Sequence, residues 1–528
     1  MRRFAFRSRR PFFPRTFSPQ CWRRAAYSLA LLPLVLAGGA SGGYYLRLHH
    51  VSAELSLAGL PVAPEIATSS SAGPASSRRI LVFSPHCDDE TLGLGGTIAE
   101  ARGAGIPVTV AFLTNGDGFP LAAGRALREV HVSPNDYIGF AKARQSESLN
   151  ALAVLGVPAP NVVFLSYPDR GLASLWAEHW DRTNPFTSRY TNRASSPYPR
   201  TFHPGAPYCG ASLLADLARL METVRPTDIY VTHPSDDHPD HATAAAFVQA
   251  ALLAARDENR PWAMHARLRY YLVHRGDWPL PQGLHPDRPL LPPASMRALD
   301  TRWEVLPLTP RARAAKHAAL ERYRSQTAVA GRFLRSFVRE NELQGSIPER
   351  YAVSASVSED SAAAATVPDA LRDDVVRNAG ASADLSGLSV RRDGDDLWVR
   401  LSARGPISPR VRYTLRLRVQ NGPDLLAAPN GAGGEAATAY ETRDLPVTRA
   451  ALRASAAPNV LEARISLRAL GASASAAPRR VWVAAETRWA GVPVDSIGFR
   501  LYVLGPVPAP RKAGRAAVPP TTTTRKRT

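Results

Sequence analysis

The chain has 528 residues, with 65 Lys or Arg against 45 Asp or Glu and a formal net charge of +20. Residues 1–24 carry eight Arg and residues 505–528 carry six Arg or Lys, with no acid in either tail, so 14 of the 20 charges lie at the two ends. The small remainder argues against a folded basic surface, so we expect no nucleic-acid partner. A chain of this length predicts two folded domains joined by linkers.

The N-terminal segment has the organisation of a membrane anchor or an export signal. A basic arm (1–24) precedes the almost uncharged, mostly apolar residues 25–46, which are long enough to span a bilayer and whose flanking arginines place the arm in the cytoplasm. Gly38 and Ala40 would also suit a signal-peptide cleavage site. We expect an anchor in the cytoplasmic membrane, with a cleaved signal as the alternative. Either one places the rest of the chain outside the cytoplasm.

After a Ser-rich linker (47–78), short apolar runs alternate with Ala- and Leu-rich helical stretches. The pattern predicts strands at 80–83, 108–114, 161–168 and 228–234, and helices at 91–105, 138–154 and 213–224. Strands that alternate with helices predict a Rossmann-like parallel sheet with helices on both faces. In such sheets ligands bind beyond the carboxyl ends of the strands.

The C-terminal part of the chain follows a different period. A second linker (346–384) precedes residues 385–506, where VRYTLRLRV (411–419) alternates strictly between apolar and polar side chains. Further short strands are separated by turns rich in Gly, Pro and Asn. The fold class predicted is therefore an α/β domain (79–345) followed by an all-β sandwich domain and a basic tail (507–528).

Acidic side chains crowd directly after the first predicted strand. Asp88, Asp89 and Glu90 follow His86 in the stretch SPHCDDETLGLGG (84–96). One interpretation is an acidic helix cap, since each carboxylate there gains about 0.3–1 kcal/mol from the helix dipole. A phosphate-binding turn is excluded, because the glycine spacing is not G-x-G-x-x-G and the carboxylates occupy the place of a pyrophosphate. A metal site is the third interpretation.

A second polar cluster follows the strand at 228–234, some 150 residues further on. Its members are His233, Asp236, Asp237, His238, Asp240 and His241. Because the carboxyl ends of parallel strands meet at one edge of a sheet, the two clusters can face one cavity. Two such clusters favour a metal site over a solvated surface loop.

Together these residues resemble the PIG-L/LmbE-like zinc-dependent N-acetylglucosaminyl deacetylases. PHCDDE (85–90) resembles the P-H-P-D-D-E motif of that family, and HPDH (238–241) resembles its second motif. Further matching stretches are TNGD (114–117), RQSE (144–147), YPDRG (167–171) and the residues around ERYRSQ (316–326). The resemblance covers residues 79–345. Cys87 stands where the family usually has proline, and in an extended segment it should face away from its neighbour His86.

The resemblance implies a catalytic zinc site, with Fe²⁺ as the alternative metal. The implied ligands are His86, Asp89 and His241, a set that leaves a fourth position for water.

The resemblance also implies the residues that carry the chemistry. Asp88 would be the general base that acts on the water, and His238 would be the cationic partner of the oxyanion and the proton donor to the leaving amine. Asp240 would hold His238 protonated and oriented, with a plain loop aspartate as the alternative. Glu90 would support the helix end.

Four further residues are candidates for substrate contact. Arg144 is a candidate for a substrate hydroxyl or phosphate, with an ion pair to Glu147 on the helix surface as the alternative. Asn115 and Asp117 would shape the cavity rim or simply form a turn, and Asp169 of YPDRG is the fourth candidate.

Two groups of aromatic residues admit a sugar-binding interpretation. The insert at 173–210 contains Trp176, Trp180, Phe186, Tyr190, Tyr198, Phe202 and Tyr208. It could form a saccharide-binding lid or a long loop that packs its own side chains. The β domain resembles carbohydrate-binding sandwiches, in which Trp398, Trp482 and Trp489 would form a sugar platform, with core packing as the alternative.

The sequence thus predicts an exported, membrane-anchored, zinc-dependent deacetylase that removes the N-acetyl group from an N-acetylglucosamine-type amino sugar or an envelope glycan. One alternative is a metal-dependent amidase on another N-acyl substrate, such as a secondary metabolite or a thiol conjugate. Another is a non-catalytic glycan-binding surface protein, which the intact set of acidic and histidine residues argues against. The oligomeric state is left open by the sequence.

Overall fold

The computed structural model describes residues 60–63, 78–296, 299–354, 366–369, 380–421, 424–425, 438–441, 452–454, 457–467 and 480–504. All of them belong to one compact unit, Leu55–Thr528. The expected basic arm, the expected membrane segment and the C-terminal tail lie outside the described residues, as do most of the two expected linkers. Within the described ranges, no helix has both the length and the apolar character needed to cross a bilayer.

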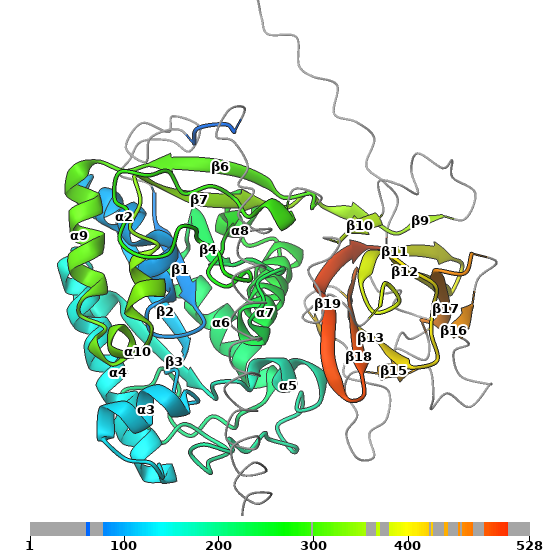
Figure 1. Cartoon of the computed structure of the whole chain (residues 1–528), viewed down its shortest axis with the longest axis horizontal. Helices are drawn as coiled ribbons and strands as arrows, with labels where there is room; N and C mark the ends of the chain where they lie inside the picture. The colour runs from blue at the N-terminus through cyan, green and yellow to red at the C-terminus, as the bar shows by residue number, and fades with distance from the viewer. Residues whose placement is uncertain are drawn as a thin grey trace, which may run out of the picture. The chain divides into compact units, whose positions relative to one another are not determined.

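The first part of the described chain consists of alternating strands and helices (Figure 1). Its strands are β1 (Ile80–Ser84), β2 (Val108–Thr114), β3 (Val162–Tyr167), β4 (Asp228–Thr232), β5 (Arg267–Tyr271), β6 (Arg302–Pro307) and β7 (Asn341–Ser346). Its α-helices are α2 (Asp89–Gly103), α3 (Pro120–Leu127), α4 (Pro134–Val154), α5 (Leu172–Ala177), α6 (Gly210–Val224), α7 (Pro239–Asp257), α8 (Pro261–His265), α9 (Pro310–Leu320) and α10 (Arg324–Arg335). Two short 3₁₀ helices are η3 (Ala159–Asn161) and η4 (Ala294–Met296).

These strands form one sheet in the order β3-β2-β1-β4-β5-β7-β6. The five strands from β3 to β5 pair in parallel, whereas β7 runs antiparallel to both β5 and β6. The predicted α/β fold with a mostly parallel sheet is confirmed. The four strands predicted from apolar runs correspond to β1 to β4, and the antiparallel edge was not anticipated.

Helices cover both faces of this sheet. Successive side chains of a strand point to opposite sides, and on β1 both sets are apolar, so both faces have to be buried. Ile80 and Val82 of β1 pack into the apolar core beneath α2, α4 and α9, whereas Leu81 and Phe83 pack into the core beneath α5, α6 and α7. Figure 1 shows α2, α9 and α10 on one side of the strands and α6 and α7 on the other.

Glycines let α2 lie unusually close to its neighbours. A Cβ atom on Gly93 would lie 2.3 Å from a ring carbon of Tyr271 in β5, and one on Gly96 would lie 2.4 Å from Leu308. Real Cβ atoms do not approach a packed ring so closely, so position 93 requires glycine, whereas a side chain at position 96 would force Leu308 to move. The glycines of the opening motif therefore serve helix packing.

A buried ion pair also holds α2 in place. Lys316 Nζ of α9 lies 2.7 Å from Glu342 Oε1 of β7 and donates to the carbonyl oxygen of Leu92. The Glu342 carboxylate accepts from the backbone N–H groups of Gly96 and Thr97 at 2.8 Å each. Helix α2, whose start carries the acidic residues, is thereby tied to α9 and to strand β7.

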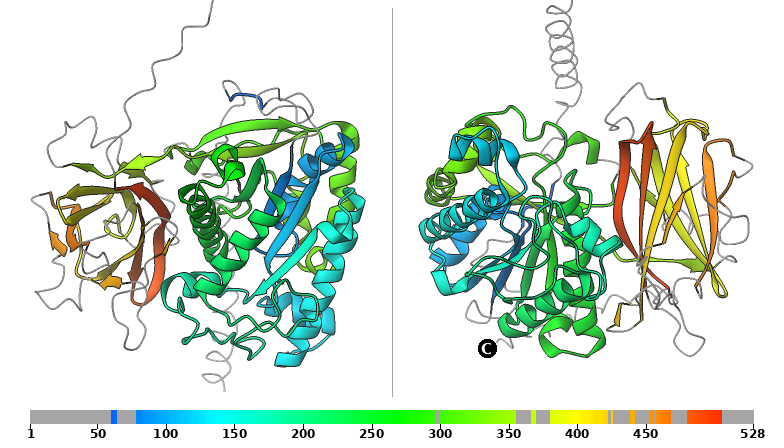
Figure 2. Two further views of the ribbon diagram at one scale, coloured as in Figure 1. Left: turned by 180° about the vertical axis from the view of Figure 1, so that it is seen from behind. Right: turned by 90° about the horizontal axis from the view of Figure 1, so that it is seen from below.

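The described part of the C-terminal region consists of two mostly antiparallel sheets around one apolar core (Figure 2); only β9 and β8 pair in parallel with their neighbours. One sheet has the order β10-β11-β12-β17-β16 with β9 beside β11, and the other has the order β14-β13-β18-β19-β8 with β15 beside β13. The strands are β8 (Arg350–Tyr351), β9 (Val353–Ser354), β10 (Thr366–Pro368), β11 (Leu385–Asp393), β12 (Asp396–Ala403), β13 (Val411–Asn421), β14 (Asp424–Leu425), β15 (Thr438–Glu441), β16 (Leu452–Ala454), β17 (Val460–Ser466), β18 (Arg480–Trp489) and β19 (Val492–Val503). The predicted all-β domain is confirmed.

Candidate metal centre

The two polar clusters meet at the carboxyl ends of neighbouring strands. β1 pairs with β4 in parallel, so the segments that follow both strands leave the sheet at the same edge. His86 lies in the turn after β1, Asp89 is the first residue of α2, and His241 lies in the first turn of α7. All three side chains are buried. The sheet therefore brings the expected ligands together from positions about 150 residues apart.

Three ligand atoms of these residues form a small triangle. His86 Nδ1 lies 3.0 Å from His241 Nε2 and 3.2 Å from Asp89 Oδ2, and the same Asp89 oxygen lies 3.1 Å from His241 Nε2. In a tetrahedral zinc site with bonds of ~2.0 Å, neighbouring ligand atoms are ~3.3 Å apart. The triangle therefore has the size and the donor types of three ligands of such a site.

The second ring nitrogen of each histidine faces a carboxylate. His86 Nε2 lies 3.2 Å from Asp169 Oδ1 and 3.4 Å from Asp240 Oδ2, and His241 Nδ1 lies 3.2 Å from Asp236 Oδ2. A metal-ligating histidine ordinarily donates its other N–H to such a group, which fixes the tautomer and the ring orientation. With the protons on the nitrogens that face the carboxylates, the lone pairs lie on His86 Nδ1 and His241 Nε2. These two atoms face one another.

The electrostatics of the cluster favour a bound cation. Burial opposes charge on His241, but Asp236 and Asp89 raise its pKa to about 9. Burial is likewise outweighed at His86, whose pKa is raised well above its usual value chiefly by Asp169. The pKa of Asp89 is held well below its usual range despite burial, chiefly by His241. Carboxylates thus surround two imidazoles that face each other. This combination of negative charge with nitrogen and oxygen donors fits a divalent metal ion.

Asp88 lies beside the ligand triangle with its carboxylate free of helix-capping bonds. Its φ of 133° lies in the region that favours glycine, and such strain is concentrated at functional sites. The pKa of Asp88 is raised to about 8, chiefly by burial; the Arg144 guanidinium opposes the shift, and the neighbouring Asp89 and Glu90 carboxylates contribute to it. Arg144 Nη2 lies 3.5 Å from Asp88 Oδ1 and also donates to the carbonyl oxygen of Cys87.

Arg144 is almost fully buried and lines the cavity. The alternative pairing with Glu147 is not formed, since Glu147 accepts instead from the backbone N–H and hydroxyl of Ser325. Arg144 therefore positions the turn that carries Asp88, and its side chain also forms part of the cavity lining.

Asp240 has a different partner from the one expected. Its carboxylate accepts from the backbone N–H groups of Arg170 at 2.6 Å and Leu172 at 3.0 Å, and it faces His86, not His238. His238 Nδ1 accepts from the backbone N–H of Asp240 at 3.2 Å. Burial lowers the pKa of His238 well below its usual value, and His86 lowers it further. The neutral ring then carries its proton on Nε2, where it can donate.

Two residues of the centre were not assigned by sequence reasoning. Asp236 accepts from the backbone N–H groups of Val273 at 3.0 Å, of His274 at 2.9 Å and of His238 at 3.0 Å, so it joins two strand ends while it orients His241. His274 follows β5 and lies with Asp89 and His241 in a group of ligand atoms within 4.8 Å of one another. The only signal for His274 was its position after the next parallel strand.

The remaining expected residues take supporting positions. Asp169 lines the cavity but contacts His86 directly. Asn115 and Asp117 do not line it: Asn115 Oδ1 accepts from Gln145 at 3.0 Å, and Asp117 Oδ2 accepts from the Tyr198 hydroxyl at 2.5 Å. Both therefore join loops around the centre.

Glu90 and Cys87 point away from the ligand triangle. Glu90 accepts from the Tyr323 hydroxyl at 2.5 Å and from Thr91 at 2.6 Å, which ties the start of α2 to the chain before α10. Cys87 packs in the apolar core, and burial raises the pKa of its thiol to about 12. The opening motif therefore gives each acidic residue a separate contact.

A cavity of about 200 Å³ opens onto the centre. Its lining combines polar residues of the centre, among them His86, Asp88, Asp89 and His238, with the apolar residues Leu92, Phe119, Ala330, Phe333 and Leu334. Gln326 of ERYRSQ also lines it. The cavity therefore exposes His86 and Asp89 of the triangle beside apolar side chains, whereas His241 is fully buried and does not line it.

The aromatic residues of the insert pack into the protein, with Trp176 against Phe247 of α7 and Phe499 of β19. The residues of the insert do not line this cavity, and most of them are buried, including Trp176, Trp180, Tyr190, Tyr198 and Tyr208. The three tryptophans of the β domain do not form one platform either. Trp482 is fully buried against α7, whereas Trp398 belongs to the other sheet from Trp489.

The fold and the site together define an α/β domain with a buried His–Asp–His cluster that could hold a metal ion at the carboxyl edge of its sheet. A family model described as PIG-L, GlcNAc-PI de-N-acetylase, matches residues 81–252. That part of the chain is a PIG-L family domain, as the sequence motifs suggested; the β domain is not identified as carbohydrate-binding.

Individual relatives are similar over the same part of the chain. The 1D-myo-inositol 2-acetamido-2-deoxy-alpha-D-glucopyranoside deacetylase of Tsukamurella paurometabola is 29% identical over 206 residues, which are 38% of this chain and 64% of the relative. The protein of the same description from Rhodococcus opacus is 30% identical over 191 residues, which are 35% of this chain and 57% of the relative. The chain therefore spans less than two thirds of the length of these curated relatives.

Among solved structures, the N,N'-diacetylchitobiose deacetylase of Pyrococcus horikoshii is similar at 17% identity and a TM-score of 0.31, over 51% of this chain and 82% of that chain.

Proposed function

We propose that the chain is a metal-dependent de-N-acetylase that acts on an N-acetylated amino sugar. The observation that carries the proposal is the triangle of nitrogen and oxygen atoms from His86, Asp89 and His241, of which His86 and Asp89 line a cavity together with Asp88 and His238. The family match and the deacetylase descriptions of the two relatives support the reaction class.

The metal, Zn²⁺ or Fe²⁺, would be held by His86, Asp89 and His241 and would polarise the acetamide carbonyl and lower the pKa of water. Asp88 takes the proton from the attacking water, a role that suits a carboxylate with a pKa raised toward neutrality. His238 donates a hydrogen bond from Nε2 to the oxygen on which negative charge develops, and the proton that Asp88 took from the water then passes to the nitrogen of the leaving amine. Acetate and a free amine are the products.

An envelope glycan is the substrate that fits the proposed location. We propose that residues 25–46, which lie outside the described residues, anchor the chain with its catalytic domain beyond the cytoplasmic membrane. Cell fractionation and N-terminal sequencing of the mature protein test this: an intact N-terminus in the membrane fraction supports the anchor, a start after Ala40 supports a cleaved signal, and a cytoplasmic protein refutes both.

A second candidate substrate class has an observation of its own. The apolar wall formed by Leu92, Phe119, Phe333 and Leu334 would accommodate an acyl group larger than acetyl. Kinetics with N-acetyl-, N-butanoyl- and N-hexanoyl-glucosamine separate the two candidates, because a pocket for acetyl alone loses kcat/KM as the chain grows, whereas an acyl pocket gains it.

The central experiment compares the full chain with its Asp88→Asn variant. Metal content and release of acetate from N-acetylglucosamine oligomers are measured for both. We expect Asp88→Asn to retain the metal and to lower kcat by about 10²–10⁴-fold. Asp237→Asn is the matched control, because Asp237 contacts Arg275 and Gly276 outside the cavity. Wild-type turnover by Asp88→Asn would refute the assigned base, and absence of acetate release by the metal-loaded wild type would refute the reaction.

A further inference from the structure

The turn between β4 and α7, residues 233–238, carries the groups that orient the metal centre. Within it, the backbone N–H of Ser235 donates to His233 Nδ1 at 2.9 Å, and the backbone N–H of Asp236 donates to the carbonyl oxygen of His233 at 2.9 Å. Asp236 then faces His241 at 3.2 Å. The position of this turn therefore sets the position of a ligand and of His238.

Strand β19 of the β domain presses on the opposite side of the same turn. A Cβ atom on Gly498 would lie 2.1 Å from the carbonyl oxygen of Pro234 and 3.5 Å from Ala242. The neighbouring contact is a backbone oxygen, which cannot rotate away as a flexible side chain can. Only glycine allows β19 to lie this close to the turn.

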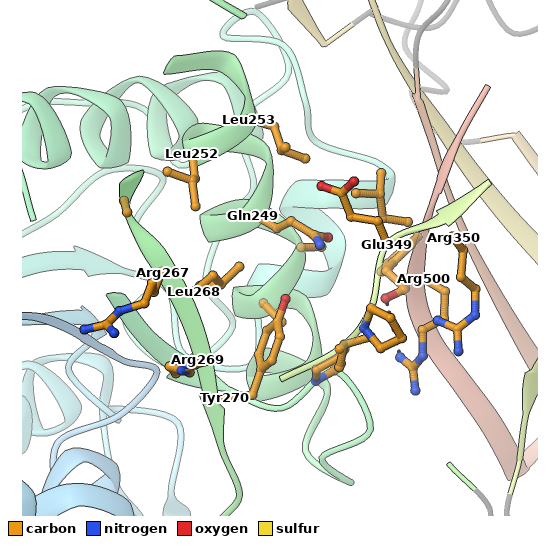
Figure 3. A pocket seen from close by; sticks show the side chains of 18 of the residues that line it. Gln249, Leu252, Leu253, Arg267, Leu268, Arg269, Tyr270, Glu349, Arg350 and Arg500 are labelled. Carbon is orange, nitrogen blue, oxygen red and sulfur yellow. Dashed lines mark hydrogen bonds between the residues drawn. The ribbon is translucent and has the colours of Figure 1, made fainter. Parts of the chain in front are cut away.

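Arg500 of β19 crosses from the β domain to the turn. Its Nη2 donates to the Ser235 hydroxyl, and its Nη1 donates to the carbonyl oxygens of Gly498 and Phe499. Arg500 is only 4% exposed, and burial lowers its pKa to about 10, so the guanidinium stays charged at neutral pH. Figure 3 shows Arg500 beside Arg350 at one wall of a cavity of about 310 Å³, with Tyr270 of β5 at the opposite wall.

The interface around this cavity is built from specific contacts. Trp482 packs in the same apolar core as α7, and its indole N–H donates to Gln249 at 3.0 Å. Arg480 forms two hydrogen bonds, of 2.5 and 2.8 Å, with the Asp257 carboxylate at the end of α7. The β domain is therefore held along α7, the helix that carries His241 near its start. These contacts fix the position of β19, from which Arg500 extends to residues 233–238.

We infer that Arg500 and Gly498 of the β domain are positioning residues of the metal centre, which hold the turn 233–238 so that Asp236 can orient His241. This inference rests on the proposed metal centre. It gives the β domain a role in the reaction of the α/β domain, and this role does not require the β domain to bind a ligand itself. A carboxylate that orients a ligating histidine affects metal affinity by 10–100-fold, so a loosened turn should reduce affinity toward the lower end of that range.

The test uses the full chain and measures metal affinity by competition with a chromogenic chelator. We expect Arg500→Ala to weaken Zn²⁺ binding by about tenfold and to change the visible absorption of the Co²⁺-substituted protein, which reports ligand geometry. Arg500→Lys, which keeps a donor for Ser235, should restore most of the affinity. Arg480→Ala is the matched control, because it removes an ion pair of the same interface far from the turn and should alter thermal stability but not metal affinity.

Ser235→Ala supplies an independent arm if Arg500→Ala does not fold. It removes the acceptor of the Arg500 bond and should by itself weaken Zn²⁺ binding. Where Arg500→Ala does fold, the two substitutions should be clearly non-additive in metal affinity in a double-mutant cycle. Wild-type affinity and an unchanged Co²⁺ spectrum in Ser235→Ala, or in a folded Arg500→Ala, would overturn the inference. A wild type that binds no metal would instead refute the proposed function, so the two failures are distinguishable.

Discussion

Replacement of Asp236 by asparagine tests how the proposed metal centre is held in place, because the substitution leaves the three proposed ligands unchanged. The Asp236 carboxylate accepts from the backbone N–H groups of His238, Val273 and His274 and faces His241 Nδ1. An asparagine has one oxygen and one NH₂ group in the same space. Whichever way the amide turns, its NH₂ group meets a backbone N–H that has lost its acceptor.

The magnitude follows from these contacts. Loss of the carboxylate that orients His241 should weaken metal binding by about 10–100-fold, which corresponds to roughly 1.4–2.7 kcal/mol. The donor left without an acceptor in a buried site should lower the free energy of unfolding of the metal-free protein by about 1–3 kcal/mol.

Chelator competition measures the first quantity and urea denaturation of the metal-free protein measures the second. Asp237→Asn is the control one residue away, because Asp237 is 44% exposed in its side chain and contacts Arg275 and Gly276. It should leave metal affinity unchanged. Equal metal affinities for Asp236→Asn and Asp237→Asn would refute the assignment of Asp236 as the group that orients His241.

Three further expectations concern stability. Gly93→Ala should lower the free energy of unfolding by about 1–3 kcal/mol, since the new Cβ would overlap Tyr271. Gly139→Ala, in open space on α4, should raise it by about 0.5–1 kcal/mol. Equal stabilities of the two variants in urea denaturation would contradict the packing argument. Lys316→Met should cost about 3–5 kcal/mol by leaving the Glu342 carboxylate buried without its cation, and Lys316→Met/Glu342→Gln should recover much of that loss in the same assay. Chelation of the metal should lower Tm, because free metal at 100 times its Kd stabilises the folded state by about 2.7 kcal/mol, and an unchanged Tm would show that nothing was bound.

The ligand set could be predicted from sequence because its signal is local at each of two places. His86 and Asp89 follow one apolar run and His241 follows another, and the alternation of strands and helices indicates that both runs end at one edge of a parallel sheet. The geometry brings these three side chains together within 3.2 Å. The roles assigned to them stay predictions until metal and activity are measured.

The partners of the second ring nitrogens could not be predicted in the same way. Asp240 is two residues from His238 in sequence, which made it the obvious partner, yet a helix begins at Pro239 and turns the Asp240 carboxylate toward His86. His274 is a single histidine after β5 with no motif around it. Such contacts depend on the direction of each helix start, which local sequence does not specify.

The contact between the two domains was also beyond sequence reasoning. Alternating residues predicted the strands of the β domain, but an arginine at position 500 reads as one more solvated side chain on a strand. Its burial against Ser235 arises only when β19 packs on the turn, where Gly498 permits the approach. The expected sugar platform failed for a related reason, because Trp482 is buried against α7.

X-ray absorption at the metal edge of the purified, metal-loaded full chain tests the central claim most directly. The claim is that His86, Asp89 and His241 form one metal centre. We expect light-atom scatterers at about 2.0–2.2 Å, with the multiple-scattering signature of two imidazoles that falls to one in His241→Ala. A sulfur scatterer at about 2.3 Å, an unchanged spectrum in His241→Ala, or a wild type that retains no metal would contradict the claim.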